Sequence, residues 1–226
     1  MTGKEWAHCA REHLLPHLRG YAVKGRLLFT TPIDWVLQGF SCEPSGFSRS
    51  AFTVQAFSQP LYVPKDHLAF VAGGRLGTLG GAAERWWSYG TDREQEIAEE
   101  VLSYIEREGL PFMAATRNPH DVALYLQRRK RKGLLPHGED EGYSWFLAGD
   151  EDKAQGVLSE VARSVAPDAP EWMLQARQRI ETVLEMLERR DASAVSQLLQ
   201  RWRDATISAL GLQKFASSSL TALSAG

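Results

Sequence analysis

Residues 35–56 read WVLQGFSCEPSGFSRSAFTVQA, and this stretch decides the fold. Near its end, polar residues alternate with three apolar ones, Phe52, Val54 and Ala56. Such alternation is typical of a strand with one buried face and one wetter face. Residues 35–42 are its expected partner, because the turn formers at 43–46 can fold the chain back on itself. The stretch therefore predicts two neighbouring antiparallel strands.

The same texture extends in both directions, from residue 21 to about residue 72. Aromatic, β-branched and small residues are interrupted there by turn formers, among them Pro32, Pro60 and Pro64. This pattern predicts a meander of four or five strands. Before it, residues 4–18 carry apolar side chains at four-residue intervals, as a helix with one buried stripe does. These side chains are Trp6, Ala10, Leu14 and Leu18.

From residue 91 onward, the apolar residues recur with the period of a helix. Thr91 and Glu94 have the spacing of a capping box, and Gly109 with Pro111 is expected to stop the helix that begins there. Four further helices are expected to begin near Asn118, Asp150, Pro170 and Ser193. The predicted fold class is therefore α+β. An N-terminal helix and an antiparallel sheet of four to five strands precede a helical C-terminal half.

Two regions are expected. Residues 1–81 form the first helix and the sheet, and residues 82–226 form a helical region packed on the sheet as one compact unit. The glycine-rich stretch 73–81 is interpreted as the hinge between them. It lacks the Gly-Lys-Ser/Thr and Gly-x-Gly-x-x-Gly patterns of phosphate-binding loops. A plain connection, with glycines that adopt positive φ, is therefore favoured over a phosphate site.

Composition excludes several classes of function. Of the 226 residues, 43% are hydrophobic and 24% are charged, as in ordinary globular proteins. The formal net charge of −2 gives the whole molecule no field that would attract nucleic acid or an anionic membrane. The sequence shows neither a signal peptide nor an apolar run long enough to span a bilayer. Cys9 and Cys42 are interpreted as reduced thiols, so we expect a cytoplasmic protein without membrane association.

No residue pattern predicts a cofactor or a catalytic group. Cys9, His13 and His17 have a spacing that suits zinc on a helix, but Pro16 interrupts that helix and no fourth ligand is evident. We therefore expect no metal and no cofactor. Acidic runs lie at residues 99–100, 139–141 and 150–152. They are interpreted as solvated faces, caps or charged loops, because a catalytic acid needs partial burial to shift its pKa.

Two features indicate a binding partner. The first is a run of five cations, Arg128, Arg129, Lys130, Arg131 and Lys132. Internal pairing or solvation is its simplest interpretation. Beyond that, the run favours an acidic protein over nucleic acid, because it lacks aromatic residues that could stack on bases. The second is the pair Trp86 and Trp87, since adjacent side chains cannot both face one core and one ring is left for a partner or a groove. A role in the core and between domains is the favoured interpretation of this pair.

Residues 52–64, Trp86–Trp87 and residues 198–206 together resemble uncharacterised bacterial proteins of unknown function, some of them encoded beside toxin–immunity loci. The resemblance implies a bacterial protein and transfers no catalytic residue. The expected function is protein interaction, as an immunity or accessory factor without catalysis. The alternative is an enzyme with an unfamiliar site between sheet and helices. A third class is a nucleic-acid-associated module that uses the basic run.

Overall fold

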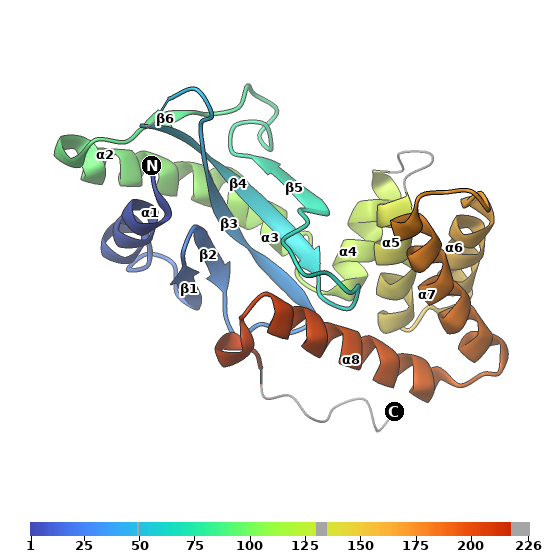
Figure 1. The fold of residues 1–226 in the computed structure, drawn as a ribbon. Helices are drawn as coiled ribbons and strands as arrows, with labels where there is room; N and C mark the ends of the chain where they lie inside the picture. The colour runs from blue at the N-terminus through green and yellow to red at the C-terminus, as the bar shows by residue number, and fades with distance from the viewer. Residues whose placement is uncertain (49, 130–134, 218–226) are drawn as a thin grey trace. The chain divides into compact units, whose positions relative to one another are not determined.

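The structure is a computed structural model that describes residues 1–48, 50–129 and 135–217. It has the predicted α+β class: an N-terminal helix and an antiparallel sheet precede a helical C-terminal half (Figure 1). The described residues divide into two compact units. Unit 1 comprises Met1–Ser58, Gly73–Ala115 and the described part of the segment from Lys214, and unit 2 comprises Gln59–Ala72 and Thr116–Gln213.

This division differs from the boundary expected near residue 81. The glycine-rich stretch 73–81 lies wholly inside unit 1, so it is not a hinge between the two units. Instead, the segment that joins two neighbouring strands, residues 59–72, belongs to the helical unit. Nothing in the local sequence pattern marks this exchange, because it depends on which distant residues the segment contacts.

The described sheet contains six strands, one more than the upper prediction. They are β1 (Tyr21–Lys24), β2 (Leu27–Thr30), β3 (Val36–Pro44), β4 (Ala51–Pro60), β5 (Ala72–Arg75) and β6 (Trp87–Ser88). Their order is β1-β2-β3-β4-β5, and β6 pairs with β4. The predicted pair around 35–42 and 52–56 is thus β3 and β4. At two residues, β6 is too short to show an alternating pattern.

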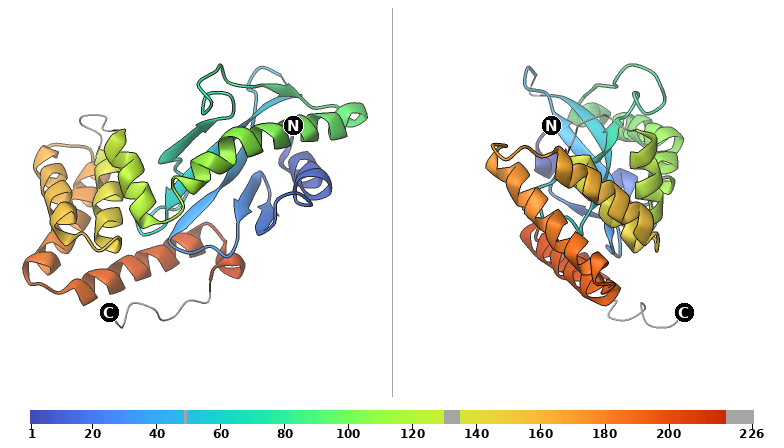
Figure 2. Two further views of the ribbon diagram at one scale, coloured as in Figure 1. Left: turned by 180° about the vertical axis from the view of Figure 1, so that it is seen from behind. Right: turned by 90° about the vertical axis from the view of Figure 1, so that its right-hand side faces the viewer.

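An aromatic cluster holds the helices of unit 1 on the sheet. Phe52 of β4 lies between Trp6 of α1 (Gly3–Cys9), at 6.3 Å between ring centroids, and Trp87 of β6, at 5.8 Å. The ring of Tyr104, from α2 (Glu94–Tyr104), meets Trp87 edge-on at 5.6 Å. Figure 2 shows α2 and α3 (Leu110–Ala114) running across one face of the sheet. These stacked and edge-on contacts add to the burial of large apolar surfaces.

The capping box predicted at Thr91 does not start α2. A 3₁₀ turn, Thr91–Arg93, precedes the helix, and Gly90 occupies its N-cap position without a side-chain hydrogen bond. Glu94 instead lies beside Cys9 and Tyr89. Burial, reinforced by the charge of Glu94, raises the pKa of each of these two groups to about 12. Glu94 is thus the first residue of α2 and also takes part in long-range contacts.

Gly109 does not stop the helix, contrary to the prediction. A π-helical turn, Ile105–Gly109, carries the chain from α2 into α3, where Pro111 occupies the first turn and needs no N–H partner. Gly109 has an ordinary helical φ of −70°. A Cβ there would lie 2.4 Å from Cε1 of the buried Phe40 ring, so the glycine permits close packing of this turn on β3.

We expect Gly109→Ala to lower the free energy of unfolding by about 1 to 2 kcal/mol, because overpacking a filled core outweighs the better helix propensity of alanine. The matched control is Gly156→Ala on α6 (Glu151–Ser164), where a Cβ meets nothing within 4 Å. That change should raise stability by about 0.5 to 1 kcal/mol. Urea denaturation measures both variants, and equal effects would mean that Gly109 does not pack against Phe40.

Unit 2 consists of helices together with the segment 59–72. The helices are α4 (Pro119–Arg128), α5 (Leu135–Leu147), α6, α7 (Glu171–Glu188) and α8 (Ala192–Ala209). Asn118 and Asp150 cap α4 and α6 as predicted, each accepting a hydrogen bond from the amide three residues on. On α5, Cβ atoms at Gly138 and Gly142 would clash with Val161 and Leu158 of α6, so the two glycines allow close helix packing.

Candidate functional site

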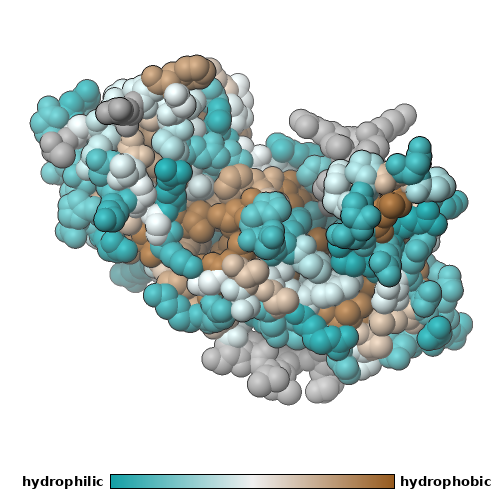
Figure 3. Space-filling view, in the orientation of Figure 1, coloured by the Kyte–Doolittle hydropathy of each residue, from teal (hydrophilic) through white to brown (hydrophobic). Residues whose placement is uncertain are grey.

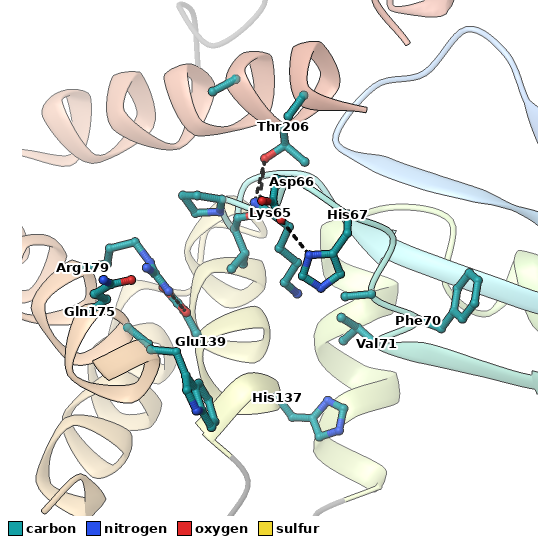
Figure 4. Close-up of a pocket in the computed structure, with 17 residues that line it drawn as sticks. Lys65, Asp66, His67, Phe70, Val71, His137, Glu139, Gln175, Arg179 and Thr206 are labelled. Carbon is teal, nitrogen blue, oxygen red and sulfur yellow. Dashed lines mark hydrogen bonds and ion pairs between the residues drawn. The ribbon is translucent and has the colours of Figure 1, made fainter. Parts of the chain in front are cut away.

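A cavity of about 850 Å³ lies within unit 2 (Figure 4). Its walls are the segment 63–71, the beginning of α5, and one side each of α7 and α8. Apolar residues form the larger part of the lining: Val63, Pro64, Ala69, Phe70, Val71, Trp172, Ala176, Ala205 and Ala209. Polar side chains complete it: Lys65, Asp66, His67, His137, Glu139, Gln175, Arg179 and Thr206.

Hydrogen bonds fix the segment 59–72 to the helices that surround it. The Tyr62 hydroxyl and the Ser144 hydroxyl of α5 lie 2.5 Å apart. Thr206 of α8 donates to the Val63 carbonyl at 3.4 Å and accepts from the Lys65 amide at the same distance. Within the segment, the Gln59 side chain accepts from the Ala69 amide at 2.9 Å. The cavity wall is therefore a structured element although it contains no helix or strand between β4 and β5.

Two ion pairs include three of the polar lining residues, Lys65, Glu139 and Arg179. Lys65 Nζ is 3.3 Å from both carboxylate oxygens of Asp140. Arg179 donates from Nε and Nη2 to the two oxygens of Glu139, at 2.7 and 2.8 Å. Figure 4 shows Arg179 extending from α7 to meet Glu139. The Tyr143 hydroxyl also donates to Glu139 Oε1, at 3.2 Å. Side chains of α7, α5 and the segment 59–72 are thus joined in one buried polar network.

In each ion pair the carboxylate is more completely buried than the cation. The side chains of Asp140 and Glu139 are 0% and 4% exposed, whereas those of Lys65 and Arg179 are 14% and 26% exposed. Burial raises the pKa of Asp140 to about 6, although the Lys65 charge opposes the shift. Burial also raises the pKa of Tyr143 well above its usual range, and the neighbouring Glu139 charge adds to the shift. Lys65, Arg179 and Glu139 therefore line the cavity, whereas Asp140 lies behind Lys65 and does not line it.

The acidic run 139–141 was interpreted from sequence as solvated or as a charged loop, and this is wrong. All three residues are buried, on the helix α5 that the sequence did not predict. Two of them are paired by Lys65 and Arg179, whose positions in sequence are 75 and 40 residues away. The only local signal for a buried helix was the aromatic sequence that follows: Tyr143, Trp145 and Phe146.

The polar side chains of the lining differ in how they are held. The residues that line the cavity include no serine or cysteine, and Thr206 is held by backbone groups of residues 63 and 65. At the rim, His67 Nδ1 lies 2.7 Å from Asp66 Oδ1, and this hydrogen bond lowers the pKa of Asp66. Both side chains are largely exposed, at 73% and 89%. Asp140, whose pKa is shifted furthest toward neutrality among the described carboxyl groups, does not itself line the cavity.

The predicted partner-binding residues lie elsewhere. Trp87 is buried in unit 1, whereas Trp86 is 37% exposed and donates from Nε1 to Glu84 at 2.9 Å. This separates the pair as expected from adjacent residues, but a partner cannot reach Trp87. Arg128 and Arg129 are exposed at the end of α4, and the Arg129 guanidinium lies 4.8 Å from the Tyr125 ring centroid. Lys130, Arg131 and Lys132 lie outside the described residues.

The glycine-rich stretch already holds an internal anion. The amides of Gly77 and Gly80 donate to Glu108 Oε2 at 2.7 and 3.1 Å, and Arg107 pairs with Oε1 of the same carboxylate at 3.0 Å. Backbone amides free of side chains suit anions, so the loop has the chemistry considered for phosphate. The side chain of Glu108 occupies that position, which favours the plain structural interpretation.

Within the described ranges, no cluster of three or more histidine, cysteine or acidic side chains is arranged to hold a metal ion. Cys9 is buried, and the helical segment that carries it ends at Leu14, before His17. The helices of the described part of the chain also include none that is long and apolar enough to cross a membrane.

Comparison with known proteins identifies no relative: no protein-family model, curated protein or solved structure matches the chain. The resemblance to uncharacterised bacterial proteins, including those of the toxin–immunity type, therefore stays a prediction. The cavity of unit 2 and the residues around it are the candidate functional site.

Proposed function

We propose that the chain is a non-catalytic protein-interaction factor, and that the cavity of unit 2 receives an apolar anchor residue of a protein partner. The observation that supports this most directly is the lining itself. Its apolar surface includes four alanines, Ala69, Ala176, Ala205 and Ala209, and the aromatic side chains of Phe70 and Trp172. Binding hot spots are typically large apolar side chains that fill such pockets.

The size and exposure of the cavity suit a partner of this kind. A volume of about 850 Å³ is within the usual range for binding pockets. Trp172 is 53% exposed, and Ala205 and Ala209 are also exposed, so the cavity is open at its α7 and α8 sides. On the face shown in Figure 3, hydrophilic residues cover most of α7 and α8, with apolar patches between them. An apolar centre with a polar rim is typical of protein interfaces.

The polar network beneath the cavity supports a structural role. Each buried carboxylate is bonded to a cation, and the pairs join segment 59–72 to α5 and α5 to α7. A catalytic acid or base must reach the reacting group. Asp140 does not line the cavity, and Glu139 is engaged by Arg179 and Tyr143. The network therefore serves to hold the cavity walls in place.

A peptide selection tests the proposal. Random peptides, displayed either with a free C-terminus or between constant flanks, are selected on the full chain. We expect enriched sequences that share one apolar anchor residue. They should bind Ala209→Trp, which fills the cavity, at least tenfold more weakly than the unmodified chain. The control is Gln197→Trp, an exposed position of α8 outside the lining, which should bind normally.

Two results would contradict the proposed role of the cavity. If the selection yields no sequences, or if its sequences bind Ala209→Trp as well as Gln197→Trp, the cavity is not the interaction site. The basic run from Arg128 then becomes the leading candidate.

An enzyme remains the second proposal, supported by the Asp66–His67 hydrogen bond at the cavity rim and the raised pKa of Asp140. A carboxylate that orients a histidine is a common device of general acid–base catalysis. The finer assignments, an immunity or accessory role in a bacterial cytoplasm and a nucleic-acid-associated role for the basic run, are predictions of the sequence that these observations do not address.

A further inference from the structure

We infer that the anchor residue is the C-terminal residue of the partner, whose free carboxylate is bound by the N–H groups of Arg179 and Lys65 at the cavity wall. This inference rests on the proposed function. It adds a definite ligand chemistry, an apolar side chain next to a carboxylate, which the apolar lining alone does not specify.

Hydrogen-bond donors of Arg179 and Lys65 remain available at the cavity wall. A guanidinium has five N–H groups, and Arg179 uses two of them on Glu139, which leaves three. An ammonium has three, and Lys65 directs two at Asp140, which leaves one. Glu139 accepts three hydrogen bonds, two of them at Oε1, and Asp140, which meets Lys65 with both oxygens, does not line the cavity. The wall therefore offers donors to a ligand that brings acceptors.

The two ion pairs also differ in which of their groups reach the cavity. In the first pair Lys65 lines the cavity and the fully buried Asp140 does not, so the positive end faces the cavity. In the second pair both residues line the cavity, and the Arg179 side chain is 26% exposed against 4% for Glu139. Hydrogen bonds from cationic donors to a carboxylate are roughly twice as strong as neutral ones. The remaining anion of the lining, Asp66, is 89% exposed, where water and salt weaken its repulsion. A carboxylate is thus favoured over an uncharged amide.

The cations and the apolar surface lie in the same cavity. Arg179 lies on the same face of α7 as Ala176, one helical turn away, and Lys65 follows the apolar pair Val63 and Pro64. A ligand that contacts the cations is therefore beside apolar surface. A C-terminal residue carries its carboxylate and its side chain on the same carbon atom, which matches this juxtaposition, and the preceding residues can leave through the exposed α7 and α8 side.

The test compares each selected peptide as a free acid and as a C-terminal amide, by fluorescence anisotropy on the full chain. The acid should bind at least tenfold more tightly. The preference should disappear in Lys65→Gln/Asp140→Asn, which replaces one ion pair by neutral groups of similar size. Arg179→Lys keeps the charge but loses the planar fork, and should reduce the preference without abolishing apolar binding. Arg177→Gln, on the same helix but outside the lining, is the control.

The outcomes separate this inference from the proposed function. Equal enrichment of the two display formats, or equal affinity of acid and amide, overturns the carboxylate assignment but leaves the cavity as the interaction site. Failure of every peptide to respond to Ala209→Trp overturns both. Decanoate is included as a free amphipathic acid: if it binds more tightly than the peptide acids with the same dependence on Arg179 and Lys65, the ligand is a small acid and the peptide assignment is wrong.

Discussion

Replacing Arg179 by alanine is expected to lower the free energy of unfolding by about 3 to 5 kcal/mol, the usual effect of removing one partner of a buried ion pair. Glu139 is 4% exposed and depends on Arg179 for two of its hydrogen bonds. Without the guanidinium, its charge stays buried and uncompensated. Urea denaturation, followed by the circular dichroism of the helices, measures the loss.

The control for this experiment lies at the end of the same helix. Arg189 and Glu185 form an exposed pair, 77% and 66% accessible and 3.9 Å apart, so Arg189→Ala should change stability by no more than about 0.5 kcal/mol. Adding Glu139→Gln to Arg179→Ala should restore part of the loss, because the second change removes the buried charge. If Arg179→Ala and Arg189→Ala have equal effects, the pair does not hold α5 and α7 together.

The second large effect is a change in the free energy of unfolding with pH, caused by the protonation of Asp140. In the folded chain its pKa is raised to about 6 from the ordinary 3.8, so the folded state binds this proton more tightly than the unfolded state does. The resulting stabilisation is complete below about pH 3.8 and is lost as the pH rises through 6. A shift of about two pH units corresponds to about 3 kcal/mol.

Asp140→Asn cannot titrate at this position and isolates the effect. Between pH 4 and pH 7, the stability of the unmodified chain should fall by about 2 kcal/mol relative to that of the variant, most of the full effect. The variant also loses the ion pair with Lys65, so the change of stability with pH is compared rather than its absolute value. The control Gly156→Ala changes stability without removing a titratable group, so its curve should run parallel to that of the unmodified chain. Parallel curves for Asp140→Asn as well would show that Asp140 does not bind a proton near pH 6.

Local patterns in the sequence were enough to predict the fold class and much of the secondary structure. The alternation at Phe52, Val54 and Ala56 marks β4, and the caps at Asn118 and Asp150 mark α4 and α6. In each case the signal and the structure lie within a few residues of each other. Turn residues and cap side chains act on their own neighbouring backbone, so they can be identified without tertiary information.

The misassigned elements share the opposite property. Gly109 packs closely against Phe40, and Glu94 lies beside Cys9 and Tyr89. Glu108 accepts hydrogen bonds from the loop amides of Gly77 and Gly80. In each case a residue that suggests a local stop, cap or surface charge makes a tertiary contact instead. Tertiary contacts routinely override local propensity.

The cavity could not be predicted for the same reason. Its polar wall depends on Lys65 meeting Asp140 and on Arg179 meeting Glu139, across 75 and 40 residues of sequence. A run of three acids is normally solvated, and only the partners supplied by two other segments make its burial possible. Composition and periodicity contain no information about such pairings.

Chemical-shift mapping of alanine methyl groups tests the central claim most directly. With ¹³C-labelled alanine methyls in the full chain, a peptide from the selection should shift the signals of the lining residues Ala69, Ala176, Ala205 and Ala209. The signals of Ala83, close in sequence to Trp86, and of Ala123 on α4, which ends at Arg128, should stay in place. Unmoved lining signals, with shifts confined to Ala83 or Ala123, would place the interaction at the tryptophan or the basic run and contradict the assignment of the cavity.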